Sequence, residues 1–115
     1  MLVEDHTATR DGTSRLLRDE GAQITEAPDG KTALQLLHSK SFDIVLLDMM
    51  LPDLDGREIL RTLQDNRPVS IRGILVLTGD LTEARVTEIR SLGADGLIGK
   101  PIDLPKLLNT LRSFV

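Results

Sequence analysis

Short apolar runs alternate with longer segments in which apolar residues return at helical spacing. The clearest runs are 44–47 (IVLL) and 74–77 (ILVL), which are continuously apolar and rich in branched side chains. Such runs are typical of strands covered on both faces, as in a parallel sheet. Weaker runs at 1–3, 22–27 and 96–99 predict three further strands.

Five helices are predicted, one after each strand. The first, at 8–20, is expected to turn Leu16 and Leu17 inward and to end at Gly21. Asp5 is a candidate cap for this helix. The other four helices are expected to begin at residues that favour helix amino termini: Asp29, Asp55 (with Glu58 in capping-box spacing), Thr82 and Asp103. Their expected inward residues are Ala33, Leu34, Leu37, Val86, Ile89, Leu92, Leu107, Leu108 and Leu111.

The order of these elements is strand–helix repeated five times. Strands that alternate with helices predict an α/β fold, with a parallel sheet covered by helices on both faces. No linker, repeat or low-complexity stretch interrupts the pattern, so residues 1–115 are expected to form one domain.

Polar and charged residues follow four of the five predicted strands. Glu4 and Asp5 end the first strand, Asp48 the third, Thr78 the fourth and Lys100 the fifth. Because ligands of parallel sheets bind beyond the carboxyl ends of the strands, these side chains are expected to share one site. Each residue alone has a common alternative role, such as a helix cap, a loop hydroxyl or a surface lysine. Their joint placement at four strand ends favours a site.

The chemistry of this set points to phosphoryl transfer. Three carboxylates packed together repel, and the pKa of each is expected to rise. A divalent cation relieves that repulsion, and oxygen ligands suit Mg²⁺. A lysine and a threonine hydroxyl can bind phosphate oxygens. A carboxylate among these groups can act as the nucleophile and become an aspartyl phosphate.

Composition removes several other classes of protein. The net charge is -4, with two aromatic residues and no basic cluster, which argues against direct nucleic-acid binding. The chain has no cysteine, so disulfides and thiolate metal sites are excluded. No apolar run approaches the ~20 residues of a membrane span, and no signal peptide opens the chain. No membrane contact is expected, and the cytoplasm is the expected compartment.

Four segments carry a resemblance to a known family. They are VED (3–5), DIVLLDMMLPDLDG (43–56), LTG (77–79) and GLIGKP (96–101). Along its whole length the chain resembles the receiver domain of response regulators in two-component signalling. The resemblance implies a flavodoxin-like, doubly wound (βα)5 fold, with a five-stranded parallel sheet in strand order 2-1-3-4-5.

The resemblance also implies roles for the residues at the predicted site. Asp48 would be the phosphoacceptor. Asp5 would bind Mg²⁺ directly, as would Asp48, and Glu4 would act mainly through water. Met50 would offer its backbone carbonyl to the metal, so its side-chain type hardly matters for binding.

Thr78 would move to hydrogen-bond the phosphoryl group, and Lys100 would pair with a phosphoryl oxygen. The peptide before Pro101 would be cis. The family often has an aromatic residue where this chain has Leu97, so the coupling that usually runs from the threonine to that aromatic is expected to be modest here. Gly79 replaces a common alanine and would loosen the loop after Thr78.

The function implied is a phosphorylation switch. A histidine kinase or phosphotransfer domain would supply the phosphoryl group, and an unidentified output domain or partner would read the changed surface. The domain would catalyse its own phosphorylation and slow dephosphorylation, so it is an enzyme only in part. A homodimer through the fourth helix, fifth strand and fifth helix is a further expectation. The chain fits a free-standing regulator, part of a DNA-binding regulator or, slightly better, the receiver of a hybrid histidine kinase.

Three alternatives are weighed against this reading. A pseudo-receiver that binds partners without phosphorylation would be expected to lack Asp48, Lys100 or the acidic pair, and all are present. An aspartate-nucleophile phosphatase needs a general acid where Met50 stands. A flavin or dinucleotide site needs a glycine-rich turn after the first strand, where Glu4, Asp5 and His6 stand instead. His6 is expected to be a surface or helix-start residue, since Mg²⁺ prefers oxygen.

Overall fold

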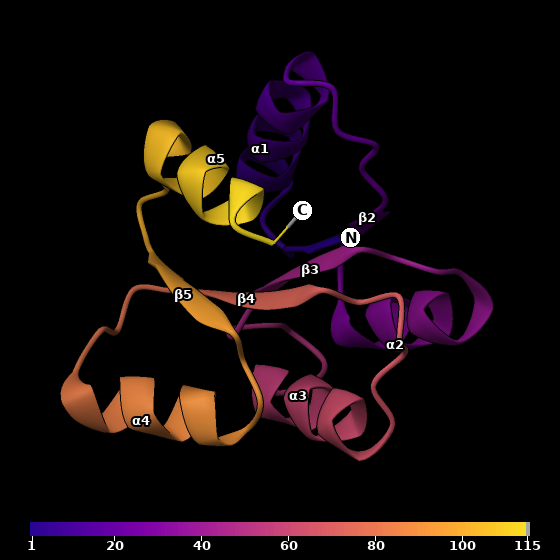
Figure 1. Cartoon of the computed structure of the whole chain (residues 1–115), viewed down its shortest axis with the longest axis vertical. Coiled ribbons are helices and arrows are strands. Elements are labelled where there is room, and N and C mark those ends of the chain that lie inside the picture. Colours follow the sequence, from indigo (N-terminus) through magenta and orange to yellow (C-terminus); the bar gives the residue numbers. More distant parts are fainter. Residues whose placement is uncertain (115) are drawn as a thin grey trace.

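The computed structural model describes residues 1–114, in which strands and helices alternate from one end to the other (Figure 1). The strands are β1 (Leu2–Val3), β2 (Glu26–Ala27), β3 (Ile44–Asp48), β4 (Gly73–Thr78) and β5 (Gly96–Gly99). The helices are α1 (Thr7–Asp19), α2 (Gly30–Ser39), α3 (Gly56–Asp65), α4 (Glu83–Ser91) and α5 (Leu104–Arg112).

The five strands form one parallel sheet in the order β2-β1-β3-β4-β5, as expected. Helices α1 and α5 lie on one face of this sheet, and α2, α3 and α4 lie on the other (Figure 1). Each strand–helix–strand connection is therefore a crossover that brings successive strand ends to the same edge.

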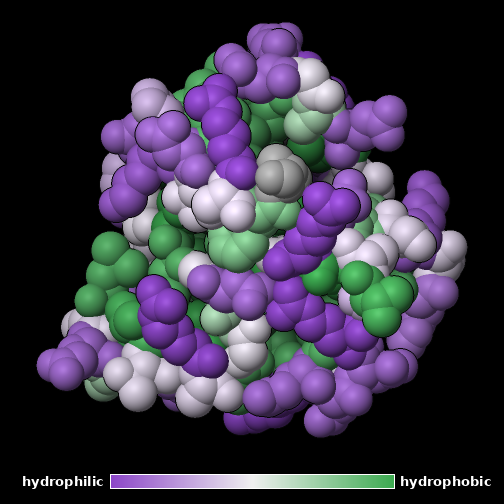
Figure 2. Space-filling view, viewed as in Figure 1, coloured by the Kyte–Doolittle hydropathy of each residue, from purple (hydrophilic) through white to green (hydrophobic). Residues whose placement is uncertain are grey.

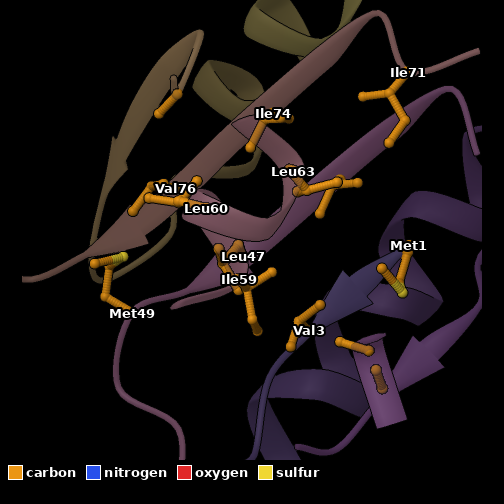
Figure 3. Close-up of a cluster of buried hydrophobic side chains, with 14 of the residues drawn as sticks. Met1, Val3, Leu47, Met49, Ile59, Leu60, Leu63, Ile71, Ile74 and Val76 are labelled. Atoms are coloured by element: carbon orange, nitrogen blue, oxygen red, sulfur yellow. The ribbon is translucent and has the colours of Figure 1, made fainter. Parts of the chain in front are cut away.

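The core divides into two clusters because side chains on a strand alternate between the faces of the sheet. On β3, Val45 and Leu47 join the cluster beneath α2, α3 and α4, which also contains Ile59 of α3 (Figure 3). Leu46 points the other way and packs with Leu17 of α1 and with other buried residues of the opposite cluster. Burial on both faces explains why the central strands are continuously apolar in the sequence.

Polar residues cover much of the outer surface, with apolar residues visible between them (Figure 2). Leu16 is 45% exposed, so the expectation that it faces inward is wrong, whereas Leu17 beside it is buried. On a helix, successive residues are turned by about 100°, and α1 presents only one narrow face to the sheet. Within residues 1–114, no helix is long and apolar enough to cross a membrane.

Local signals predicted most helix starts. Asp29, Thr82 and Asp103 each accept a bond from a backbone amide of the helix that follows. Asp55 caps α3 through the amide of Arg57, while the Glu58 amide donates to the Asp55 backbone carbonyl, so the expected capping box is replaced by a tighter turn.

Two other expectations about element ends differ from the structure. Helix α1 is capped by His6, whose Nδ1 accepts the Thr9 amide, rather than by Asp5. Strand β2 spans two residues instead of the expected 22–27, because β1, its only partner in the sheet, is equally short. A strand exists only as far as a neighbour supplies hydrogen bonds.

Candidate functional site

The sheet register brings the sequence-predicted residues to one edge. Val3 is level with Leu47, so Glu4 and Asp48 follow at the same height on neighbouring strands. Thr78 is level with Gly99, which places Lys100 just beyond it. The amide of Lys100 donates to the Thr78 carbonyl at 2.9 Å and extends the ladder by one bond.

Asp48 lies at the centre of the site and is 3% exposed. Its Oδ2 accepts a bond from Lys100 Nζ at 2.9 Å, and its Oδ1 accepts the Met50 amide at 3.0 Å. Lys100 Nζ also donates to Glu4 Oε1 at 3.5 Å. The nearby ammonium stabilises the charged form of this buried carboxylate.

Glu4 is 1% exposed, and its Oε2 is buried without a hydrogen-bond partner among the described residues. Asp5 beside it is exposed. Carboxylate oxygens of Glu4, Asp5 and Asp48 all lie within 4.8 Å of one another. Three carboxylates this close, one of which has an unpartnered oxygen, are a donor set that a hard divalent cation would satisfy.

The two buried carboxyl groups differ in pKa. Burial raises the pKa of Glu4 to about 7, helped by the neighbouring carboxylate of Asp48. Burial also opposes ionisation of Asp48, but the neighbouring Glu4 carboxyl group and the hydrogen bonds from Lys100 and the Met50 amide outweigh it and lower the pKa of Asp48. The expectation that all three carboxyl groups have a raised pKa is therefore wrong for Asp48.

The pKa of Lys100 is raised, as expected for the partner of a charged carboxylate. Burial alone would lower its pKa, but its hydrogen bond to Asp48 and the charges of Asp48 and Glu4 raise it. The ammonium therefore stays protonated at neutral pH. The peptide between Lys100 and Pro101 is cis, as expected.

Met50 is placed by its backbone. Its side chain is 80% exposed, while its amide donates to Asp48 and its backbone forms an antiparallel bridge with Asp55. The Gly56 amide closes this loop on the Met49 carbonyl at 3.1 Å. A Cβ at Gly56 would meet the Met49 Cα at 2.8 Å, so glycine is needed for the close approach.

Thr78 is buried, but its hydroxyl is turned toward its own loop. Oγ1 accepts the Asp80 amide at 3.1 Å and donates to the Asp80 carbonyl at 3.4 Å. The Asp80 carboxylate in turn accepts the Thr82 amide at 3.0 Å. The sequence pattern did not predict that Asp80 would hold Thr78 in this way. Aspartate side chains commonly form turns by accepting the backbone amide two residues later, as Asp80 does with Thr82.

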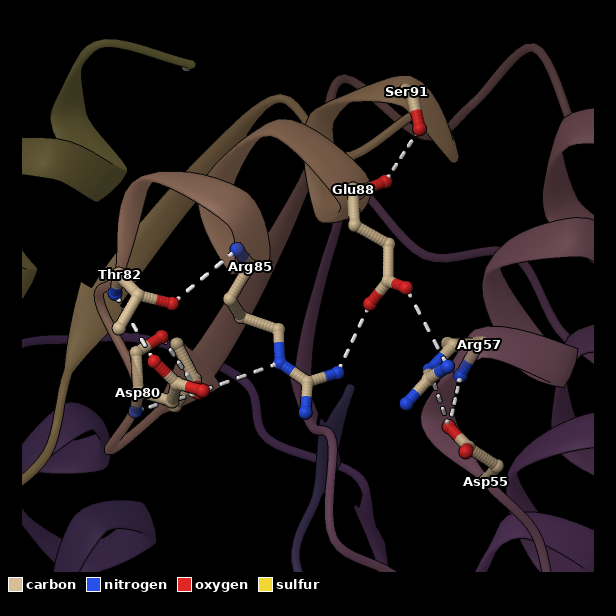
Figure 4. Close-up of polar contacts among 8 residues, drawn as sticks. Asp55, Arg57, Asp80, Thr82, Arg85, Glu88 and Ser91 are labelled. Atoms are coloured by element: carbon tan, nitrogen blue, oxygen red, sulfur yellow. Dashed lines mark hydrogen bonds and ion pairs between the residues drawn. The ribbon is translucent and has the colours of Figure 1, made fainter.

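A row of charged side chains links the loops on either side of the site (Figure 4). Arg57 of α3 pairs with Asp55 and with Glu88 of α4, both at 3.5 Å. Arg85 pairs with Glu88 at 3.0 Å and with Asp80 at 3.6 Å. This row connects the loop after β3 to the loop after β4, and the contact between Arg57 and Glu88 had no local signal in the sequence.

Fold and site together define a class of protein. Residues 1–112 match the sequence model of the response regulator receiver domain, so the chain belongs to that family. It is 38% identical over 119 residues to the response regulator MprA of Mycolicibacterium vanbaalenii, covering 100% of this chain and 49% of that protein. It is 32% identical over 102 residues to the chemotaxis protein CheY of Pseudomonas aeruginosa, covering 88% and 82%.

Solved structures agree with this family. The chemotaxis protein CheY4 of Vibrio cholerae superposes with a TM-score of 0.90 at 28% identity, covering 99% of this chain and 95% of that one. The strand order 2-1-3-4-5 implied by the resemblance is thereby confirmed. The chain spans about half the length of the first curated relatives it matches.

Proposed function

We propose that the chain is a phosphorylation-dependent signalling switch in which Asp48 accepts a phosphoryl group beside a bound Mg²⁺. The observation that carries this proposal is the surroundings of Asp48. This buried carboxylate has a lowered pKa and a lysine ammonium at 2.9 Å, and it lies next to a buried glutamate oxygen without a partner. It is ionised at neutral pH and therefore able to act as a nucleophile.

The step is a transfer from a phosphohistidine of a kinase or phosphotransfer domain. An Asp48 carboxylate oxygen attacks phosphorus, a P–O bond forms, and the P–N bond breaks with its electron pair returning to the imidazole. Lys100 is placed to neutralise charge on a phosphoryl oxygen, since its Nζ already contacts Asp48. Attack by water on the aspartyl phosphate later releases inorganic phosphate and restores the carboxylate.

The residues of the acidic edge fit a magnesium ion. Asp5, Asp48 and the Met50 carbonyl are the expected direct ligands, and Glu4 is expected to act through water. A bound Mg²⁺ supplies charge neutralisation on the transferring group. Oxygen donors alone, with one side of the cluster exposed at Asp5, suit a cation that keeps several waters.

Thr78 would carry the signal outward. Its hydroxyl must leave Asp80 to reach a phosphoryl group on Asp48, and the loop that leads into α4 would move with it. A partner that binds this changed surface would read the state of the switch. A homodimer through α4, β5 and α5 is one such arrangement and stays a prediction.

We further propose residues 1–115 as one receiver domain acting in the cytoplasm, where ATP-dependent histidine kinases supply phosphoryl groups. Likeness to a response regulator and to a chemotaxis protein supports a kinase or phosphotransfer partner. Direct nucleic-acid contact by this domain is not part of the proposal.

The test is chemical labelling. Acetyl phosphate with Mg²⁺ should add one phosphoryl group, labile to hydroxylamine, as measured by intact-mass spectrometry. Asp48→Asn should remove the label, and Asp5→Ala should slow labelling strongly at low Mg²⁺. Asp11→Asn, which changes an exposed aspartate of α1, is the matched control and should label normally. Equal labelling of wild type and Asp48→Asn would refute the assignment. No labelling of wild type would favour a pseudo-receiver instead.

A further inference from the structure

The loop between β3 and α3, residues 49–55, is tied to a helix that is distant in sequence. Asp53 Oδ1 accepts the Gly30 amide, and Oδ2 accepts the Lys31 amide, both at 2.9 Å. Gly30 and Lys31 are the first two residues of α2. One carboxylate thus binds two adjacent backbone amides that have no partner within their own helix.

The two hydrogen bonds of Asp53 are stronger than bonds between neutral groups. Both bonds run to a charged acceptor at a helix amino terminus, where the helix dipole favours negative charge. The two amides stabilise the charged carboxylate and lower the pKa of Asp53. Packing adds to it, because a Cβ at Gly30 would lie 2.8 Å from Leu54, so the loop and α2 approach as closely as a glycine allows.

The same loop carries Met50, whose backbone carbonyl is the expected metal ligand. The Met50 side chain is 80% exposed, so side-chain packing does little to fix this residue. Its position depends on backbone ties: its amide bonds to Asp48, and its backbone pairs with Asp55. Asp53 lies between these two ties, and its two hydrogen bonds anchor this part of the loop to α2.

We propose that Asp53 is a positioning residue for the cation site: by clamping residues 49–55 to α2, its carboxylate holds the Met50 backbone in place for metal binding. This inference rests on the proposed function, since it assumes a cation beside Asp48. The physical reason is preorganisation, because a ligand held in place before binding loses less conformational entropy when the metal arrives. Groups that orient metal ligands influence affinity in this way in many metal sites.

A simpler role, that of a helix cap, must be separated from this one. Asp29 provides the comparison, because its Oδ1 accepts the Thr32 amide of the same helix at 2.7 Å and ties α2 to itself rather than to the loop. Loss of either carboxylate removes one negative charge and one cap from α2. Only loss of Asp53 removes the hydrogen bonds between residues 49–55 and α2.

The experiment compares Asp53→Ala with Asp29→Ala by NMR. Mg²⁺ titrations followed at the amides of residues 48–54 should show affinity reduced about fivefold in Asp53→Ala, somewhat less than a typical loss of a ligand-orienting group. Asp29→Ala should stay within about twofold of wild type on the same scale. In metal-free protein, the Met50 amide should exchange faster in Asp53→Ala only, although both variants should melt at lower temperature.

Asp53→Asn, which keeps one acceptor oxygen, should be intermediate and guards against a poorly folded alanine variant. Labelling of Asp53→Ala by acetyl phosphate at saturating Mg²⁺ should approach the wild-type rate. Unchanged Mg²⁺ affinity in Asp53→Ala, or equal weakening in Asp29→Ala, would reduce Asp53 to a helix cap. A wild-type protein that binds no Mg²⁺ would instead overturn the proposed function, and this role with it.

Discussion

Glu4 and Asp48 are neighbouring carboxyl groups whose pKa values are shifted in opposite directions. Lys100 Nζ is 2.9 Å from Asp48 but 3.5 Å from Glu4, and only Asp48 receives a backbone amide as well. Asp48 is therefore charged at neutral pH, whereas Glu4, with a pKa raised to about 7, is protonated in a large fraction of molecules. When Glu4 is uncharged, the two buried carboxyl groups do not repel each other.

The raised pKa of Glu4 predicts how stability depends on pH in metal-free protein. The folded state holds the Glu4 proton more tightly than the unfolded state, in which the pKa has its ordinary value of 4.5. Glu4 therefore favours folding below pH 4.5, and this contribution is lost as pH rises toward about 7. The free energy of unfolding of wild type should fall relative to that of Glu4→Gln across this range. Urea denaturation at several pH values, followed by circular dichroism, measures the difference.

Glu4→Gln keeps the shape of the side chain but cannot titrate, so groups that do not interact with Glu4 cancel in the comparison. Parallel pH profiles for the two proteins would show that Glu4 titrates normally and would contradict the effect of burial on its pKa. The comparison is made with a chelator present, because a bound cation would remove the proton from Glu4.

Single residues of the site were predictable where the strand-end rule applied. Glu4, Asp48, Thr78 and Lys100 all lie where their strands end, as the sequence pattern indicates. The lowered pKa of Asp48 was not predictable, because it depends on which carboxylate the lysine reaches. Asp53 was missed as well, since its partners are 22 and 23 residues away and its own segment looks like an ordinary turn.

At the scale of elements, the loop from β4 to α4 holds Thr78 away from Asp48. The Thr78 hydroxyl is bonded to Asp80, and the Asp80 carboxylate is held by the Thr82 amide and by Arg85. Arg85 also contacts Glu88, so the loop is braced against the first turns of α4 (Figure 4). For Thr78 to reach a phosphoryl group, this bracing must loosen.

Removing Arg85 should therefore make the switch easier. Arg85→Ala should bind beryllofluoride, a noncovalent mimic of the phosphoryl group, about threefold more tightly than wild type, because partly exposed ion pairs contribute up to about 1 kcal/mol. Isothermal titration calorimetry in the presence of Mg²⁺ measures this affinity. Arg90→Ala, an exposed arginine on the same helix, is the control and should change little.

The affinity for beryllofluoride depends on how strongly Arg85 bonds in each of the two states. If Arg85 bonds as well in the phosphorylated form as in this one, its loss cancels and affinity is unchanged. Weaker beryllofluoride binding by Arg85→Ala would mean that the arginine supports the active form instead. Either outcome would remove the bracing role from the row of charges in Figure 4.

Element boundaries followed the sequence where a local signal set them. Capping residues fixed the starts of α2, α4 and α5, and glycines with φ near 94° and 98° follow α1 and α4. Boundaries set by a distant partner were less predictable. The length of β2 depends on how much of β1 stands beside it, and that length is not written in residues 22–27.

At the scale of the whole molecule, the sheet separates two layers of helices, and each layer packs on its own hydrophobic cluster (Figure 1). The continuously apolar runs of β3 and β4 predicted burial on both faces, and the parallel sheet followed from the alternation of strands and helices. The strand order did not follow from pattern alone and came from the resemblance to receiver domains. Leu97 of β5 is level with Val76 of β4 and packs against the cluster that contains Ile59 of α3 and Ile89 of α4.

This position of Leu97 limits how far a signal should travel. When Thr78 moves toward a phosphoryl group it leaves space, and a leucine fills less of that space than the aromatic residue that the family often has. Beryllofluoride should therefore shift the amides near Asp48, Thr78 and Lys100 strongly and those of residues 83–91 weakly. Two-dimensional NMR of wild type and Leu97→Tyr compares the two faces in one experiment.

Leu97→Tyr should enlarge the response of residues 83–91 while leaving the response near Asp48 unchanged, because only the filling of the space behind Thr78 differs. A ligand moves an equilibrium by its differential affinity for the two states, so a better-filled active state should be more fully populated at saturation. Large shifts in slow exchange across α4 of the wild-type protein would show a complete switch without the aromatic residue. In that case the side chain at position 97 would not determine how strongly Asp48 is coupled to the α4 face.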